Sequence, residues 1–119
     1  MKVDDIRVFI PSKDYENSKA FYTDLGFSGE YVTDDLTLFA SAECTFFLQR
    51  FYNKDLAENL MLQLIVLDID AAFEIANKST YKTKITLIQQ ERWGKVFYLW
   101  GPSGELWHVT QLTQTIDHN

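Results

Sequence analysis

The order of the predicted secondary structure elements constrains this chain most, because the same order occurs twice along 119 residues. Each half shows one strand, then one helix, then three strands. Few folds place a single helix after the first strand of each four-stranded unit, so a repeated βαβββ pattern indicates an α+β fold built from two similar modules. The halves share little sequence, so the repeat is one of element order and not of residues.

The first half carries clear signals for these elements. Its predicted strands occupy residues 6–10, 27–33, 36–41 and 45–51. Asp14 can cap the intervening helix, because its carboxylate accepts hydrogen bonds from N–H groups of the first turn. Gly26 supplies the left-handed residue that ends this helix, and Asp34-Asp35 makes a tight turn between the second and third strands.

The second half follows a polar segment, residues 52–59, that lacks strand alternation and is expected to be a linker. Asp68 and Asp70 offer caps for the second helix, and strands are predicted over 60–67 and 84–89. We therefore expect a single domain. Its parts are module one at about 1–51, the linker at about 52–59, module two at about 60–112, and a C-terminal tail at 113–119.

The last two strands form a hairpin from Trp93 to Gln111, with turn chemistry in its Gly-Pro-Ser-Gly segment. Residues that alternate along each strand share one face of the sheet. These are Val96, Tyr98 and Trp100 on the first strand, and Leu106, His108 and Thr110 on the second. The hairpin therefore points an aromatic surface and one histidine in one direction, and Trp107, on the opposite face, is expected in the core.

Composition excludes several classes of function. The net charge is −6, so binding to nucleic acid or to an anionic membrane surface is disfavoured, whereas cationic small molecules are electrostatically welcome. The single Cys44 rules out an internal disulfide and a Cys-based zinc site, and it is expected to be a buried, inert thiol on a strand. No signal-peptide core and no apolar run of about 20 residues occurs, so a cytoplasmic protein is expected.

Two motifs carry a resemblance to a known superfamily. The segment D-x-x-x-S-x-x-F-Y-x-x-L-G-F runs from Asp14 to Phe27, and G-P-S-G-E-L-W-H ends at His108. Together with the element order, they resemble the vicinal oxygen chelate superfamily of glyoxalases, extradiol dioxygenases, fosfomycin-resistance enzymes and bleomycin-resistance proteins. The resemblance spans nearly the whole chain and implies two βαβββ modules that pair into an open, barrel-like cup.

Enzymes of that superfamily hold a divalent metal with four side chains, and motif spacing places the corresponding positions here near Asp5, Gln49, Met61 and His108. Only His108 is a good ligand for the usual metals. We find no Ser-His-Asp order, no paired carboxylates beside a histidine and no phosphate-binding glycine loop. We therefore expect no catalytic residues, no metal ligands and no cofactor.

Four longer segments, L-G-F-S-G-E-Y-V-T-D-D, L-T-L-F-A-S-A, W-G-K-V-F and G-P-S-G-E-L-W-H-V, resemble the bleomycin-resistance branch of this superfamily. Members of that branch are acidic homodimers that sequester a cationic glycopeptide antibiotic in grooves between subunits without any reaction. The resemblance and the aromatic hairpin face together suggest a set of ligand-binding residues. These are Glu30, Tyr31, Ser41, Gln63, Trp93, Trp100, Gly104 and His108. The expected function is the sequestration of a cationic or planar antibiotic, bleomycin-like or related, by a homodimer.

Two alternatives stay open: a metal-dependent glyoxalase, dioxygenase or thiol-transferase type of enzyme, and a binding module for an unrelated metabolite. Individual residues also have ordinary structural explanations. Tyr31 can simply pack, Glu30 can be a solvated strand charge, and His108 can be a satisfied histidine of the barrel. The Asp34-Asp35 turn is shorter than the aromatic-bearing loop that known binders of this branch carry, so the resemblance leaves open whether bleomycin itself or a smaller planar cation is the ligand.

Overall fold

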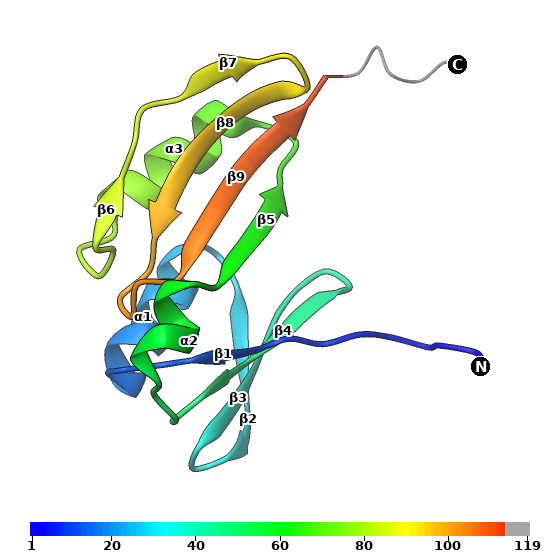
Figure 1. The fold of residues 1–119 in the computed structure, drawn as a ribbon, viewed down its shortest axis with the longest axis vertical. Coiled ribbons are helices and arrows are strands. Elements are labelled where there is room, and N and C mark those ends of the chain that lie inside the picture. Colours follow the sequence, from blue (N-terminus) through cyan, green and yellow to red (C-terminus); the bar gives the residue numbers. More distant parts are fainter. Residues whose placement is uncertain (114–119) are drawn as a thin grey trace.

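The structure, a computed structural model, describes residues 1–113 and shows two α+β modules, each with a mixed sheet and a helix on one face (Figure 1). The α+β class and the paired βαβββ modules are thereby confirmed. The two sheets are not hydrogen-bonded to each other within these residues, so one chain does not close a barrel by itself. No helix in this part of the chain is long and apolar enough to cross a membrane.

Module one has the sheet order β1-β4-β3-β2, with β1 parallel to β4 and the other pairs antiparallel. Its elements are β1 (Phe9–Pro11), α1 (Tyr15–Asp24), β2 (Ser28–Thr33), β3 (Leu36–Ser41) and β4 (Cys44–Gln49). Asp14 caps α1 as predicted, since its Oδ1 accepts from the Asn17 N–H at 3.0 Å. Gly26, with φ of +103°, follows the helix and lets the chain turn back into the sheet.

Module two has the order β5-β9-β8-β6, with β7 also paired to β8. Its elements are β5 (Met61–Ile65), α3 (Ile69–Lys78), β6 (Lys84–Ile85), β7 (Gln89–Glu91), β8 (Gly94–Trp100) and β9 (Leu106–Leu112). The predicted linker contains a short helix, α2 (Lys54–Glu58), which Asn53 caps by accepting from the Leu56 N–H.

The single strand predicted over 84–89 is instead two short strands, β6 and β7. The Tyr98 N–H donates to the Thr86 hydroxyl at 2.9 Å instead of to a backbone carbonyl. A side-chain acceptor here interrupts the ladder with β8, because the regular antiparallel pattern needs backbone carbonyls in sequence. Hydrophobic periodicity alone could not reveal this interruption.

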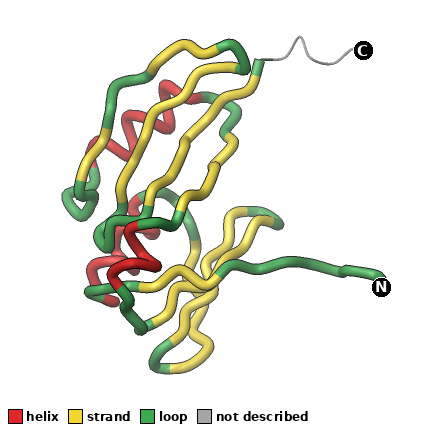
Figure 2. The backbone as a smooth tube through the Cα atoms, in the orientation of Figure 1, coloured by secondary structure: helices red, strands yellow, loops and turns green. Residues whose placement is uncertain are grey.

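The first strand is also shorter than predicted, since β1 begins at Phe9 and not at residue 6. Toward the N-terminus, the last backbone hydrogen bond of this strand runs from the Phe47 N–H to the Val8 carbonyl oxygen, at 2.9 Å. Residues 1–8 therefore form an extended arm that runs away from the body of the molecule (Figure 2). The apolar residues that suggested a strand are present, but no backbone ladder forms around them.

The core crosses the boundary between the modules. Tyr22 of α1 is fully buried and meets Trp107 of β9 with ring centroids 6.0 Å apart. Phe46 packs on both rings, at 4.9 Å from Tyr22 and 5.8 Å from Trp107. The indole N–H of Trp107 donates to the Tyr22 hydroxyl at 3.1 Å. Trp107 is thus a core residue, as predicted, and it fixes one module against the other.

Candidate functional site

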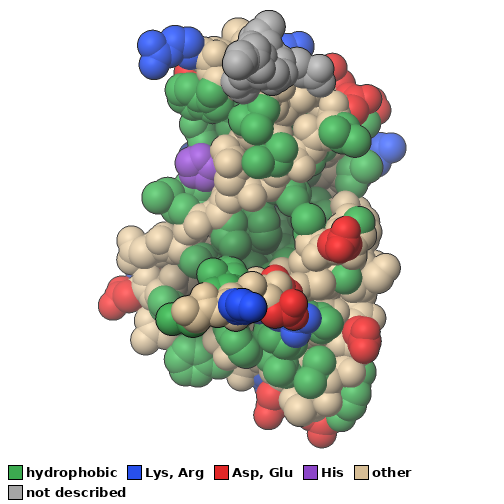
Figure 3. Space-filling model, turned by 90° about the vertical axis from the view of Figure 1, so that its right-hand side faces the viewer, with side chains coloured by type: hydrophobic (Ala, Val, Ile, Leu, Met, Phe, Trp, Pro, Cys, Tyr) green, Lys and Arg blue, Asp and Glu red, His purple; other side chains and the backbone are tan. Residues whose placement is uncertain are grey.

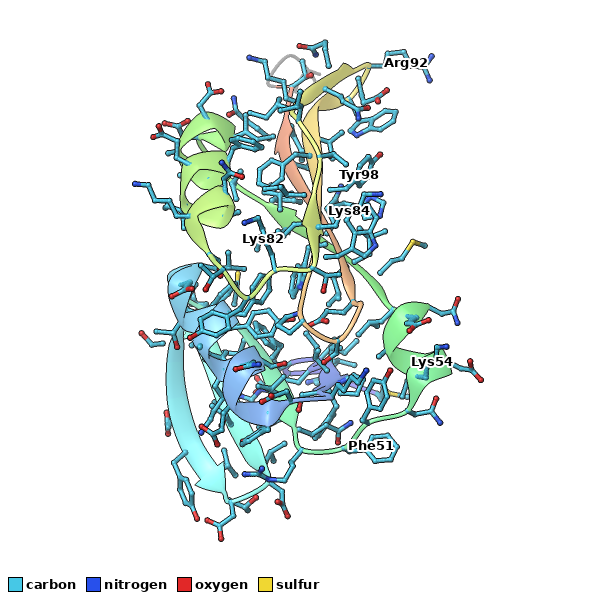
Figure 4. The ribbon with its side chains drawn as sticks, turned by 90° about the vertical axis from the view of Figure 1, so that its left-hand side faces the viewer. Phe51, Lys54, Lys82, Lys84, Arg92 and Tyr98 are labelled. Atoms are coloured by element: carbon cyan, nitrogen blue, oxygen red, sulfur yellow. The ribbon has the colours of Figure 1, made fainter. Side chains whose placement is uncertain are left out.

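The second sheet has one face covered by α3 and one face that no other helix or strand of residues 1–113 covers, which we call the open face. Phe73 of α3 packs edge-on against Phe97 at 5.3 Å, so Phe97 and its alternates point toward the helix. Tyr98 and Lys84 point to the other side of the sheet, away from α3 (Figure 4). The open face therefore carries the alternate residues of each strand: Met61, Gln63, Ile65, Lys84, Thr86, Val96, Tyr98, Trp100, Leu106, His108 and Thr110. Of these, Val96 and Thr110 are buried.

The strand register assembles a row of polar and aromatic groups at the middle of this face. Gln63 lies opposite His108, and His108 lies opposite Tyr98. The Tyr98 and His108 rings are 4.9 Å apart and nearly perpendicular, at 89°. The Tyr98 and Trp100 rings are 6.4 Å apart, and the Lys84 Nζ lies 5.0 Å from the Trp100 ring centre. The open face thus presents a continuous aromatic strip with amide, imidazole and ammonium groups along it.

His108 is half-buried, and its Nε2 is sealed from solvent without a hydrogen-bond partner among the described residues. A buried polar atom without a partner costs free energy unless something else supplies the bond. The Gln63 Nε2 is near, but it points to the Thr110 hydroxyl at 3.4 Å. Within this part of the chain, the Nε2 of His108 is therefore a buried nitrogen without a partner at the centre of the aromatic strip.

The positions that correspond to the superfamily's metal ligands are scattered. Asp5 lies in the arm, where its carboxylate accepts from the Ile6 N–H at 2.7 Å and lies 3.4 Å from Arg7. Met61 is 66% exposed at the start of β5. Within residues 1–113, no three His, Cys, Asp or Glu side chains gather as a metal site would require.

Glu30 and Tyr31, which were expected to line one groove, point to opposite faces of the first sheet. Tyr31 pairs with Thr37, whose hydroxyl is hydrogen-bonded to Tyr15 of α1 at 2.6 Å, so Tyr31 lies on the helix side. Glu30 pairs with Leu38 and lies on the face away from α1. Tyr31 is 72% exposed and donates to Asp34 at 2.9 Å. Within one chain, the sheet separates these two residues.

The other predicted positions lie at three separate places. Trp93 is half-exposed in the turn between β7 and β8, at the opposite end of β8 from Trp100. Ser41 ends β3 and borders a pocket on the α3 side of the molecule. Gly104 has φ of +93° in the turn before β9, where an added Cβ would lie 3.0 Å from the Glu58 side chain.

Of the predicted set, the structure therefore brings together Gln63, Trp100 and His108 on the open face. Sequence reasoning left Tyr98 and Lys84 out of this group. Tyr98 could have been included, because it alternates with Trp100 along the same strand. Lys84 could not, because its place beside Trp100 depends on the pairing of β6 with β8.

Cys44 is exposed, and the prediction of a buried thiol was wrong. It is the first residue of β4 and follows the tight turn in which Ala42 takes a positive φ of 53°. At the end of the hairpin, Cys44 borders a pocket and is not packed into the core, so its side chain is exposed. A strand-like sequence context was not enough to predict burial.

The motif G-P-S-G-E holds a fully buried carboxylate and is structural. Glu105 accepts from the Ser103 N–H at 2.9 Å and from the Tyr22 hydroxyl at 2.5 Å. Gly101 makes room for it, because an added Cβ would lie 2.5 Å from the carboxylate. Burial raises the pKa of Glu105, and burial together with the nearby Glu105 raises the pKa of Tyr22 well above its ordinary value.

Solved structures of bleomycin-resistance, bleomycin-binding and glyoxalase/bleomycin resistance proteins share this two-module α+β architecture. One similar structure is a bleomycin resistance determinant encoded on the transposon Tn5, with a TM-score of 0.76 and 18% identity; the match covers 92% of this chain and 98% of that one. A bleomycin-binding protein complexed with bleomycin has a TM-score of 0.76 and 18% identity, and the match covers 93% of this chain and 100% of that one.

TnmS3, an antibiotic binding protein from Streptomyces sp. CB03234, has a TM-score of 0.80 and 18% identity, with 95% of this chain and 99% of that chain covered. No protein-family model and no curated protein matches the sequence. At these identities the similarity establishes the fold, and it confirms the architecture that the sequence motifs implied.

Proposed function

We propose that this protein binds a small planar molecule on the open face of its second sheet and carries out no reaction on it. The observation that carries the proposal is the row formed by Trp100, Tyr98 and His108, in which stacking surfaces adjoin an unpartnered, buried Nε2. An aromatic ligand ring stacked on this row would gain about 1 kcal/mol for each ring pair. Its polar substituents would find His108, Gln63 and Lys84 within the same strip.

A cationic, bleomycin-like antibiotic is the ligand that we propose first. The chain carries a net charge of −6, which favours the approach of cations over anions. Two proteins with the same fold, a bleomycin-binding protein and the antibiotic binding protein TnmS3, support this choice. The sequence-based groove residues Glu30, Tyr31, Ser41, Trp93 and Gly104 contribute only if a second copy brings them to the open face.

We also propose that the protein is a homodimer whose second copy completes the site. Apolar side chains of the open face and the arm are uncovered: Met61 is 66% exposed, Ile65 56% and Ile6 79%. Hydrophobic side chains also gather in a hollow between the upper and lower parts of the molecule (Figure 3). Uncovered apolar surface of this extent is typical of contact regions, and a two-fold partner would bury it.

Titration of the purified protein with bleomycin, followed by tryptophan fluorescence, tests the proposal. We expect quenching in the wild type and about tenfold weaker binding in Trp100→Ala, since the loss of one stacking partner costs about 1 kcal/mol or slightly more. Tyr81→Ala is the control, because Tyr81 is 38% exposed, lies outside the open face and leaves all three tryptophans in place. Equal affinity in Trp100→Ala and the wild type would contradict the proposed site.

Sedimentation and metal analysis of the same samples complete the test. A concentration-independent monomer would contradict the proposed dimer. Stoichiometric zinc, nickel, manganese or iron that is lost in His108→Ala would replace the binding proposal with the metal-dependent alternative. Binding of a planar cation other than bleomycin, weakened in Trp100→Ala, would support the site and change only the ligand.

A further inference from the structure

A cavity lies on the other side of the second sheet, between that sheet, α3 and the module-one residues 25–27, Ser41 and Cys44, and we call it the α3 pocket. Its volume is about 410 Å³. The sheet contributes Leu64, Phe97 and Val109, and the helix contributes Ala72 and Ala76. These sheet residues alternate with those of the open face, so the sheet itself separates the two sites. A ligand in one would not contact the other.

The α3 pocket is preformed, because the helix is held at its first turn and at its middle. Asp68 caps α3 by accepting from the Ala71 N–H at 3.1 Å, and the Ile69 N–H donates to the Gln111 side chain at 2.9 Å. Farther along, Phe73 packs against Phe97 at 5.3 Å. The alanines of the inner helix surface are too short to fill the space between these anchors, so the volume stays open.

The lining of the pocket is apolar except for a few groups, of which Asp68 is the only one with a formal charge. One oxygen of its carboxylate serves as the helix cap. The hydroxyl of Ser41 and the thiol of Cys44 lie on the opposite wall, at the β3–β4 hairpin. A ligand that matches this distribution has an apolar body and a single positively charged or hydrogen-bond-donating end.

We propose that the α3 pocket binds a small amphiphilic amine, with its alkyl or aryl part between α3 and the sheet and its ammonium group at Asp68. The volume lies within the range of about 300–1,000 Å³ that small-molecule sites occupy. It is more than twice the size of an apolar cavity of about 150 Å³ that accepts benzene. A medium-length alkyl chain or a fused bicyclic ring therefore fits. Complementary charge selects the amine over a carboxylate of the same length.

Cys44 provides a direct measure of occupancy, because it is the chain's only cysteine, is exposed and lines the pocket. The rate of its alkylation by iodoacetamide, followed by mass spectrometry, is measured with nonylamine and with nonanoate below their micellar concentrations. We expect nonylamine to slow alkylation in a saturable manner and at lower concentration than nonanoate. No protection by either compound would overturn the proposal.

Two variants with one control test the individual contacts. Asp68→Asn keeps the helix cap but removes the charge, so the preference for nonylamine should fall about threefold, as for an exposed ion pair. Asp70→Asn, in the same helical turn but outside the pocket lining, should leave the preference unchanged. Ala72→Leu places a larger side chain in the cavity and should abolish protection, while thermal unfolding verifies that the variant is folded.

Three outcomes would count against the proposal. Unchanged protection in Ala72→Leu would mean that the amine acts elsewhere. Equal loss of preference in both aspartate variants would mean that overall charge, and not contact with Asp68, selects the amine. Protection that rises with protein concentration in the absence of amine would mean that a second copy occupies the pocket. Trp100→Ala should leave protection intact, so this test does not depend on the open face.

Discussion

Replacement of Tyr22 by phenylalanine removes one hydroxyl from a fully buried network, and we expect a large, pH-dependent loss of stability. The hydroxyl donates to Glu105 and accepts from the Trp107 N–H. Its removal leaves a carboxylate oxygen and an indole N–H without these partners inside the protein. Each unsatisfied buried group costs about 1–3 kcal/mol, so with two such groups the free energy of unfolding should fall by about 2–6 kcal/mol at neutral pH.

The pH dependence follows from the ionisation of Glu105. Burial raises the pKa of Glu105 above its ordinary 4.5, and the bond from Tyr22 partly lowers it again. When folding raises the pKa of a group, that group stabilises the folded protein at pH values below the pKa it has in the unfolded chain. This stabilisation is lost as the pH rises through the pKa that the group has in the folded protein. Without Tyr22 the pKa rises further. The deficit of Tyr22→Phe should therefore be largest at neutral pH and smaller near pH 4.5.

Urea unfolding at pH 7.5, 6 and about 4.5, followed by tryptophan fluorescence, measures this deficit in a chain short enough for two-state analysis. Tyr81→Phe is the matched control, because Tyr81 is 38% exposed and its hydroxyl lies outside this network. That control should change stability by less than about 0.5 kcal/mol. A Tyr22→Phe deficit below about 1 kcal/mol, or one that does not change with pH, would refute the reasoning.

Further predictions concern the same carboxylate, one glycine and one helix cap. Glu105→Gln removes the ionisable carboxyl group, so the free energy of unfolding should decrease less steeply with rising pH than in the wild type. Urea unfolding between about pH 4.5 and 7.5 measures this slope, and an unchanged slope would contradict the prediction. Gly94→Ala should destabilise by about 2–4 kcal/mol in thermal unfolding, because φ is +149° and the new Cβ would lie 2.1 Å from the Gln111 carbonyl oxygen. Asp14→Ala should cost about 1 kcal/mol and Asp14→Asn much less, since either Asp or Asn can accept from the Asn17 N–H; equal losses in the two would argue against capping.

Much of the fold could be predicted from local sequence. The caps at Asp14 and Asp68, the stop at Gly26 and the alternation along the hairpin are short-range signals, and each depends on residues within one or two turns of each other. The same alternation predicts that Trp100 and Tyr98 share a face. It also implies that Glu30 and Tyr31 diverge, which the motif comparison overlooked.

The tertiary structure alone decided the pairing of these local pieces. Lys84 meets Trp100, and Gln63 meets His108, through strand registers between segments far apart in sequence. Glu105 is buried because α1 brings Tyr22 to it, although a glutamate in a turn is ordinarily solvated.

The sequence by itself thus determined most of the elements, their order, and which residues share a face, because these follow from capping, turn chemistry and periodicity. Only the tertiary structure decided that Cys44 is exposed, that an aromatic strip surrounds a His108 Nε2 without a partner among residues 1–113, and that a cavity remains beneath α3. Burial, register and empty volume are properties of contacts between distant segments, and no local pattern in the chain specifies them.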